Sequence, residues 1–252
     1  MKFKENLHVP IWGTEQWVCS AHHSSPSVIA SGKYEGKTLD VLYPSFPLLM
    51  KVIDARQRLS VQVHPNERTS LITGGSPKSE MWCALSDGPI FAGLKEGSTP
   101  SMVKEAVVSG AFEELLVRHE AKRGDVFYIP GGLVHAIGDG VRLYEVQQSS
   151  DTTFRLYDWG RKDSDGKPRT LHIEEALKAL DFSLPVPVAV QSLETPYFKF
   201  WQEDVSGERV FTAKEGMFLS IYGEKTGQVL LADGESECIC VDDDHLMITE
   251  FK

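Results

Sequence analysis

The sequence predicts a mainly β protein with a small helical insert and a second, smaller β domain. Short apolar stretches punctuated by Gly, Pro, Asn and Asp dominate the chain, and several of them alternate apolar and polar residues with the period of a β-strand. At 252 residues the chain is long enough for one principal domain with an appendage. We place the boundary before the connector-like Pro185-Val186-Pro187, which gives a principal domain at 1–184 and a smaller one at 185–252.

The composition is that of an ordinary globular protein and argues against several classes. No apolar run approaches the roughly 18 residues that a membrane span needs. The formal charge of -10 argues against a nucleic-acid partner, so an anionic ligand must be bound by a local pocket. We expect a cytoplasmic protein without membrane partners, because the N-terminus has no apolar segment of a secretory signal. The four cysteines lack the spacing of a disulfide framework, and Cys238 and Cys240 are expected on one face of a late strand.

The first half of the chain contains four expected strands. Residues 48–54 form one, and residues 58–64 form a second that Pro65-Asn66 closes. In the second strand, the period of two directs Leu59, Val61 and Val63 to one face and Ser60, Gln62 and His64 to the other. Residues 80–85 and 90–94 flank the turn Ser86-Asp87-Gly88-Pro89 and are expected to form a hairpin.

The remainder of the principal domain mixes helices with strands. Apolar residues between 101 and 116 have helical spacing that is interrupted near Gly110, and residues 173–180 predict a further helix. Between them, residues 124–130, 134–137 and 141–148 are expected to form strands. Beyond the connector we expect the short strands of a partial second barrel at 198–201, 210–211, 217–221, 229–231 and 238–241.

Three motifs in order resemble a known enzyme family. The run from Gly124 to Pro130, followed five residues later by His135, resembles the second motif of the cupins. Together with Ser60-Val61-Gln62-Val63-His64-Pro65-Asn66 and Lys78-Ser79-Glu80-Met81-Trp82, the segment Ile129-Pro130-Gly131-Gly132-Leu133-Val134-His135 resembles the ordered signatures of type I mannose-6-phosphate isomerases. The resemblance implies a cupin (jelly-roll) β-barrel as the catalytic domain and an abbreviated second β-barrel.

The resemblance also implies a catalytic metal site. By position in the motifs, its ligands are Gln62, His64, Glu80 and His135. Two oxygens and two nitrogens suit one Zn²⁺ per chain, and would also accept Mn²⁺, Co²⁺ or Fe²⁺. The set contains no thiolate, which argues against a purely structural zinc site.

Further residues match family positions that handle the sugar. Interconversion of an aldose and a ketose needs a base, stabilisation of an oxyanion, and anchoring of the phosphate. By resemblance, Glu145 and Lys78 are the candidates for proton transfer and Arg155 steadies the enediolate charge. Ser60 and Arg161 match positions that hold the phosphate. Three of them have an ordinary alternative: Glu145 as a solvated strand carboxylate, and Lys78 and Arg161 as surface cations without a role.

The resemblance therefore implies an isomerase of D-mannose 6-phosphate and D-fructose 6-phosphate, and two other classes stay open. One is a metallo-cupin that binds a phosphosugar or another small sugar without turning it over. The other is a metal-dependent cupin oxygenase, which usually has a ligand set richer in histidine. The retention of Lys78, Glu145 and Arg155 beside the ligands favours the enzyme. The sequence leaves the oligomeric state open.

Overall fold

The computed structural model describes residues 1–162, 165–234 and 238–252, and the chain is mainly β, as predicted. Its residues separate into two compact units that are not consecutive in sequence. The larger unit comprises Leu7–Glu15 and Val52–Ala189, and the smaller comprises Met1–Asn6, Gln16–Lys51 and Val190–Lys252. The larger unit ends near the boundary expected at residue 184, but residues 1–6 and 16–51 belong with the C-terminal segment. Patterning along a chain does not report which distant segment completes a sheet. That residues 1–184 form the catalytic domain stays a prediction.

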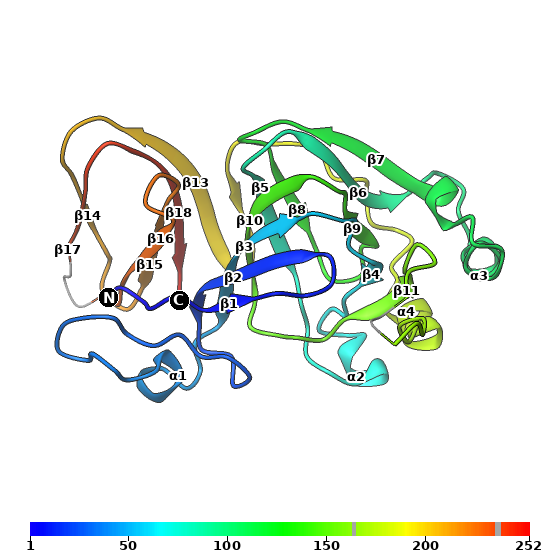
Figure 1. Ribbon diagram of the computed structural model, residues 1–252, viewed down its shortest axis with the longest axis horizontal. Helices are drawn as coiled ribbons and strands as arrows, with labels where there is room; N and C mark the ends of the chain where they lie inside the picture. Colours follow the sequence, from blue (N-terminus) through cyan, green and yellow to red (C-terminus); the bar gives the residue numbers. More distant parts are fainter. Residues whose placement is uncertain (163–164, 235–237) are drawn as a thin grey trace. The chain divides into compact units, whose positions relative to one another are not determined.

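Two sheets build the larger unit (Figure 1). The first has the order β1-β2-β3-β10-β5-β8 and the second the order β11-β4-β9-β6-β7. Strands β2 and β3 also have residues in the smaller unit. The strands of the first sheet are β1 (Leu7–His8), β2 (Gly13–Ser20), β3 (Leu48–Ala55), β5 (Glu80–Ala84), β8 (Val126–Ile129) and β10 (Val141–Gln148). Those of the second are β4 (Val61–Val63), β6 (Gly88–Leu94), β7 (Leu116–Ala121), β9 (His135–Ile137) and β11 (Phe154–Tyr157).

The main core of the larger unit lies between these sheets. One buried apolar cluster joins Trp82 and Phe127 of the first sheet to Ile90 and Ile137 of the second. Burial of each such side chain contributes about 1.5–3 kcal/mol, so the two interior faces are held firmly together. A polar side chain on an interior face is therefore costly unless it has a partner or a function.

Helices cover the other face of the second sheet. Val61 and Val63 pack in a cluster with the apolar residues of α3 (Pro100–Ser109), the 3₁₀ helix η1 (Phe112–Leu115) and α4 (Ile173–Ala179). The sequence accounts for the limits of α3: the Thr99 side chain accepts a hydrogen bond from the Met102 amide, and Gly110 ends the helix in the left-handed conformation with φ 77°. Helix α2 (Ser70–Thr73) is a single turn of the same unit.

Two expectations for the larger unit are wrong. Strands β5 and β6 do not form a hairpin, because β5 pairs with β10 and β8 whereas β6 pairs with β7 and β9. The turn between them carries the chain from one sheet to the other. The turn residues alone do not determine whether the next strand joins the same sheet or a different one. Leu59 is also misplaced: it lies before β4 and packs in the cluster between the sheets, not beside Val61.

The smaller unit has a five-stranded sheet, in the order β12-β13-β18-β15-β16, and a two-stranded sheet of β14 and β17. Leu219, Ile221, Leu246 and Ile248 of the larger sheet share a core with Phe211 and Ile239 of the pair. The expected strands are present, but β18, which pairs with both β13 and β15, was not expected. The elements are α1 (Leu39–Leu42), β12 (Leu193–Glu194), β13 (Phe198–Val205), β14 (Arg209–Thr212), β15 (Phe218–Gly223), β16 (Gln228–Ala232), β17 (Cys238–Val241) and β18 (Asp244–Phe251).

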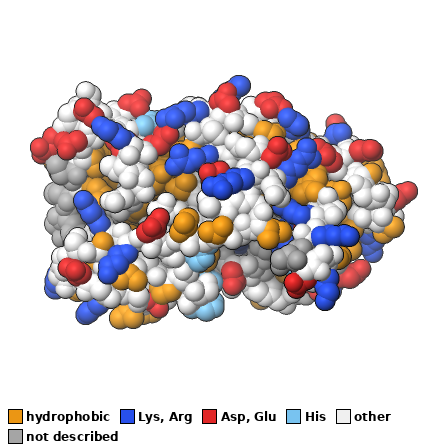
Figure 2. Space-filling model, viewed as in Figure 1, with side chains coloured by type: hydrophobic (Ala, Val, Ile, Leu, Met, Phe, Trp, Pro, Cys, Tyr) orange, Lys and Arg blue, Asp and Glu red, His pale blue; other side chains and the backbone are white. Residues whose placement is uncertain are grey.

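Neither the charges on the visible face nor the helices show a feature that the composition did not lead us to expect. Figure 2 shows acidic and basic side chains interspersed on the visible face. Within the described part of the chain, no helix has both the length and the apolar character required to cross a bilayer.

Candidate metal centre and active site

The predicted metal ligands meet between the two sheets. Gln62 in β4 pairs directly with His135 in β9, so both side chains lie on the interior face of the second sheet. His64 follows β4 on the same side, and Glu80 begins β5 in the facing sheet. His64, Glu80 and His135 are each only 1% exposed. The structure thus brings together four polar residues from three separate segments.

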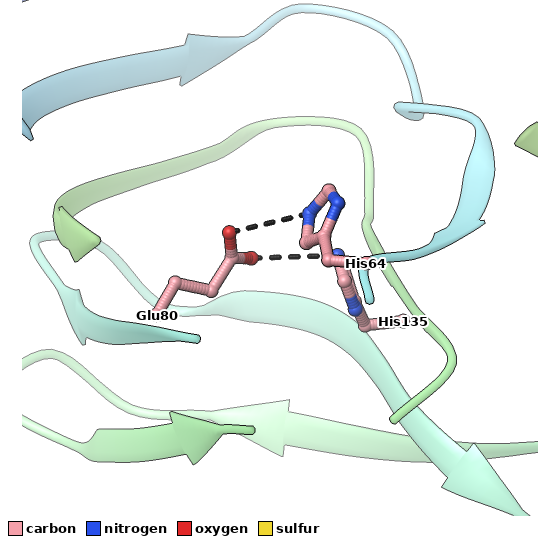
Figure 3. Close-up of side chains that lie close together, drawn as sticks. All are labelled: His64, Glu80 and His135. Carbon is pink, nitrogen blue, oxygen red and sulfur yellow. Dashed lines mark ion pairs between the residues drawn. The ribbon is translucent and has the colours of Figure 1, made fainter. Parts of the chain in front are cut away.

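Figure 3 shows the carboxylate of Glu80 directed at both imidazoles. Its Oε2 lies 3.4 Å from Nε2 of His64, and its Oε1 lies 3.4 Å from Nε2 of His135. One ligand atom of each residue lies within 4.8 Å of the other two. The amide of Gln62 lies at the same place, with Nε2 3.3 Å from Nε2 of His135. A half-turn exchanges the amide nitrogen and oxygen, so Gln62 can also present an oxygen there.

Main-chain carbonyls fix the tautomer of both histidines. Nδ1 of His64 lies 2.8 Å from the carbonyl of Thr152, and Nδ1 of His135 lies 2.9 Å from the carbonyl of Leu133. A carbonyl only accepts, so each Nδ1 carries the proton and donates. Each Nε2 then directs its lone pair at Glu80, which is the arrangement of a metal-binding histidine.

Burial keeps the two imidazoles neutral. Burial, followed by the charge of Lys78, lowers the pKa of His64 to about 3, and burial also lowers the pKa of His135. For Glu80, burial would raise the pKa, but the positive charge of Lys78 outweighs burial and holds the pKa well below its usual range. Near neutral pH the site is therefore one carboxylate facing two uncharged nitrogen donors.

These donors fit a divalent cation. Two lone pairs facing a carboxylate repel it, and a positive charge between them removes the repulsion. Lys78 already supplies one positive charge there, because its Nζ lies 3.0 Å from Nε2 of His64 and 3.1 Å from Oε2 of Glu80. A mixed nitrogen and oxygen set without thiolates suits zinc and the related first-row ions.

Glu145 lies on the same interior face as Glu80. It pairs across the sheet with Trp82, two positions from Glu80, and its Oε2 accepts a hydrogen bond of 3.0 Å from the indole nitrogen. The Trp82 ring stands edge-on to the ring of His135, with centroids 5.4 Å apart. Glu145 is thus connected to the metal centre through Trp82, and its role in proton transfer stays a prediction.

Arginines gather at the neighbouring strand β11. Arg155 pairs with Gln62, which places it on the interior face beside the ligands. Arg155 donates to the carbonyl of Thr170 at 2.8 Å, while its Nε is buried and has no acceptor in the described part of the chain. Burial, followed by the charge of Arg169, lowers the pKa of Arg155. A half-buried guanidinium with an unused N–H is suited to bind an oxyanion.

One carboxylate holds two more arginines there. Asp158 accepts from Arg161 at 2.6 Å and from Arg169 at 2.6 and 2.7 Å. Burial would raise the pKa of Asp158, but these hydrogen bonds outweigh it and lower the pKa. Nε of Arg161 is likewise buried, and no described residue accepts from it. Three guanidinium groups against one carboxylate leave an excess of positive charge that suits a phosphate.

Sequence reasoning did not select two of the residues that the structure places at this site. Ser60, which was selected, is buried immediately before β4, and its contact with phosphate stays a prediction. Arg169 and Lys167, in the segment Gly166-Lys167-Pro168-Arg169, were cations that could help to hold the phosphate, but nothing in the sequence singled out Arg169, which the structure places against Asp158. Thr152 acts through its carbonyl, which every residue has, so no side-chain signal could have pointed to it.

Comparisons with known proteins agree with this site. The family described as phosphomannose isomerase type I, catalytic domain, matches residues 12–81. The chain is 37% identical over 219 residues to a mannose-6-phosphate isomerase of Streptococcus mutans, covering 77% of this chain and 69% of that protein. It is 35% identical over 245 residues to the mannose-6-phosphate isomerase ManA of Bacillus subtilis, covering 86% of this chain and 78% of that protein.

A solved structure extends the likeness to the whole chain. The crystal structure of a mannose 6-phosphate isomerase from Bacillus subtilis matches with a TM-score of 0.86 and 25% identity, covering 100% of this chain and 99% of that one. Both units of the fold are therefore common to the two proteins. The identity to curated relatives, the shared fold and the ordered motifs lead to one conclusion: the chain belongs to the type I mannose-6-phosphate isomerase family.

Proposed function

We propose that this protein interconverts D-mannose 6-phosphate and D-fructose 6-phosphate through an enediol. One observation carries the proposal: Glu80 faces two neutral imidazoles in the metal-binding tautomer, with Lys78 and Arg155 on the same interior surfaces. A protein that only binds a sugar needs neither a proton-transfer group nor an oxyanion partner beside the metal site. The names of the relatives support the same activity.

The metal proposal assigns one Zn²⁺ to Gln62, His64, Glu80 and His135, with other divalent ions of the same class as substitutes. When bound, the ion supplies a Lewis acid that polarises a sugar oxygen. The hydrogen bonds from His64 to Thr152 and from His135 to Leu133 keep both Nε2 atoms available as ligands. His64, Glu80 and His135 are buried, which limits the competition of bulk water for these three ligands.

Side chains of the protein are assigned to proton transfer and to stabilisation of the enediolate. The proton moves between C1 and C2 of the sugar, and Lys78 and Glu145 are the candidate groups to carry it. Lys78 lies within 3.1 Å of Glu80, at the centre itself, whereas Glu145 is reached through Trp82. This placement favours Lys78 as the group nearer to the sugar. Arg155 steadies the negative charge of the enediolate with its unused N–H.

The phosphate is assigned to Ser60, Arg161 and Arg169. The clamp that Asp158 forms with Arg161 and Arg169 holds both guanidinium planes at fixed positions, so less rotamer entropy is lost on binding. The proposed compartment is the cytoplasm. No nucleic-acid or membrane partner is proposed, and the formal charge of -10 argues against a surface for nucleic acid.

A turnover assay with and without metal tests the function. Protein loaded with Zn²⁺ is expected to produce fructose 6-phosphate from mannose 6-phosphate, to lose this activity on chelation, and to regain it when Zn²⁺ is restored. The coupled formation of fructose 6-phosphate is the measurement. Metal-loaded protein that binds mannose 6-phosphate without turnover would identify a binding module instead. Oxygen uptake on addition of a substrate would identify an oxygenase.

Replacing Arg169 by Ala is expected to raise KM for mannose 6-phosphate by about 10- to 100-fold, because a hydrogen bond to a charged group contributes about 1.5–3 kcal/mol. The smaller effect on kcat distinguishes anchoring from chemistry. Mannose without the phosphate should show no comparable change in KM. Lys104→Ala, which removes an exposed cation on α3, is the matched control. An equal rise in KM for mannose 6-phosphate and for mannose would count against a contact between Arg169 and the phosphate.

A further inference from the structure

Gln147 is a buried polar side chain that the proposed reaction does not use. It is fully buried in β10 and lies directly opposite Glu80 across the β5–β10 pair, so the two side chains share the interior face. Its Nε2 donates to the carbonyl of Gln148 at 2.9 Å and to the carbonyl of Ser150 at 2.8 Å. Its Oε1 is buried and has no hydrogen-bond partner among the residues that the structure describes.

The two carbonyls determine how this amide is oriented. Reversal of the amide would set Oε1 against two other oxygens, so the nitrogen must face them. The arrangement leaves one acceptor unsatisfied in the interior, at a cost of about 1–3 kcal/mol. A glutamine that served packing alone would not need that cost. The side chain therefore acts as a clamp on the chain that leaves β10.

The clamped chain first reaches the Glu80 segment. The amide of Gln148 donates to the carbonyl of Ser79 at 3.0 Å, and the amide of Ser79 donates to Oε1 of Gln148 at 2.8 Å. Ser79 lies between Lys78 and Glu80, so these bonds tie the clamped segment to two groups of the metal centre.

The same chain then reaches His64. The hydroxyl of Ser150 donates to the carbonyl of Ser76 at 3.0 Å and accepts from the amide of Thr152 at 3.2 Å. The amide of Ser76 returns a hydrogen bond of 2.9 Å to the hydroxyl of Thr152. These bonds fix the residue whose carbonyl accepts from Nδ1 of His64 at 2.8 Å.

We propose that Gln147 is a positioning residue of the metal centre, which holds Ser150 and Thr152 so that His64 keeps its proton on Nδ1 and its lone pair on Nε2. The inference rests on the proposed function for the identity of the centre. Gln147 is not a catalytic residue, because its contacts are to main-chain carbonyls. Glutamine suits the task because its amide group supplies two donors, which neither a carboxylate nor an apolar side chain of the same length does.

Gln147→Met tests the proposal, because methionine keeps the length of the side chain and removes both donors. The purified full chain, stripped of metal, is titrated with Zn²⁺ against a competing chelator, and ¹⁵N chemical shifts report the tautomer of His64. We expect Zn²⁺ affinity to fall about 10- to 100-fold, the range for a partner that orients a metal ligand, and His64 to become a mixture of tautomers. KM for the sugar should change less than Zn²⁺ affinity.

Val146→Ala is the matched control. Val146 is fully buried on the same strand and pairs with Met81, and its side chain lies on the opposite face. This variant should lose stability while Zn²⁺ affinity and the tautomer of His64 stay as in the unchanged protein. A similar loss of affinity in Val146→Ala, or unchanged affinity in Gln147→Met, would overturn the positioning role.

Ser150→Ala is a second, milder variant that tests the same network. Should Gln147→Met fail to fold, Ser150→Ala removes one hydroxyl of the network; it is expected to lower Zn²⁺ affinity several-fold, and unchanged affinity would refute the proposal. Both readouts are independent of turnover. An unchanged protein that binds Zn²⁺ but does not isomerise mannose 6-phosphate would therefore reject the proposed function and leave the positioning role to be decided by the variants.

Discussion

Glu80→Gln is expected to abolish both metal binding and turnover. The amide keeps the size of the side chain but removes the negative charge that faces both imidazoles at 3.4 Å. Loss of a direct ligand should reduce Zn²⁺ affinity by more than the roughly 10- to 100-fold that loss of an orienting partner causes. Metal content of the purified protein, Zn²⁺ titration and turnover are the measurements.

The same substitution should also destabilise the metal-free protein. Lys78 would keep its buried charge without the carboxylate that lies 3.1 Å away, and breaking a buried pair typically costs about 3–5 kcal/mol. Denaturant unfolding of the metal-free protein measures this loss. Glu105→Gln, an exposed carboxylate on α3, is the control and should leave metal content, turnover and stability unchanged. A Glu80→Gln protein that retains tightly bound metal and full turnover would remove Glu80 from the ligand set.

Arg155→Ala is expected to lower kcat by about 10²- to 10³-fold, the usual effect of removing one donor that stabilises an oxyanion. Arg155 stands next to Gln62 across the sheet, and its buried Nε has no acceptor within residues 1–162, 165–234 and 238–252. An interaction made mainly in the transition state lowers kcat and kcat/KM together. Steady-state kinetics with mannose 6-phosphate is the measurement.

Metal content separates this effect from that of Glu80→Gln. Arg155 donates to the carbonyl of Thr170 and does not touch the ligands of the proposed metal through any described hydrogen bond, so Zn²⁺ affinity should stay within a few-fold of its original value. Arg155→Lys keeps the charge but not the planar fork, and we expect it to recover only part of the activity. Near-normal kcat in Arg155→Ala would reject the role in stabilising the enediolate.

Most strands could be predicted because their patterns are local. Residues 48–54 and 141–148 alternate or run apolar between turn residues, and they form β3 and β10. The helical spacing between 101 and 116, with its interruption at Gly110, gave α3 and η1. Strand β18 was not predicted, because the run Asp242-Asp243-Asp244 at its start is untypical of a strand. Its pairing with β13 and β15 joins segments that are distant in sequence, which a local pattern does not report.

The sequence by itself determined which residues can carry the chemistry. Gln62, His64, Glu80 and His135 were predicted from ordered motifs, and the structure brings them together in one buried cluster. Side-chain donor type and position along a strand are local properties, so a linear pattern retains them.

Only the tertiary structure decided how these residues work together. It placed β5 and β6 in different sheets, fixed both histidine tautomers through carbonyls, and brought Arg169 to Asp158. It also joined residues 16–51 to the C-terminal segment. These outcomes depend on main-chain groups and on contacts between distant segments. Every residue carries the same main-chain groups, and the free energy of a distant contact depends on the whole packing arrangement, so neither is encoded in a local pattern.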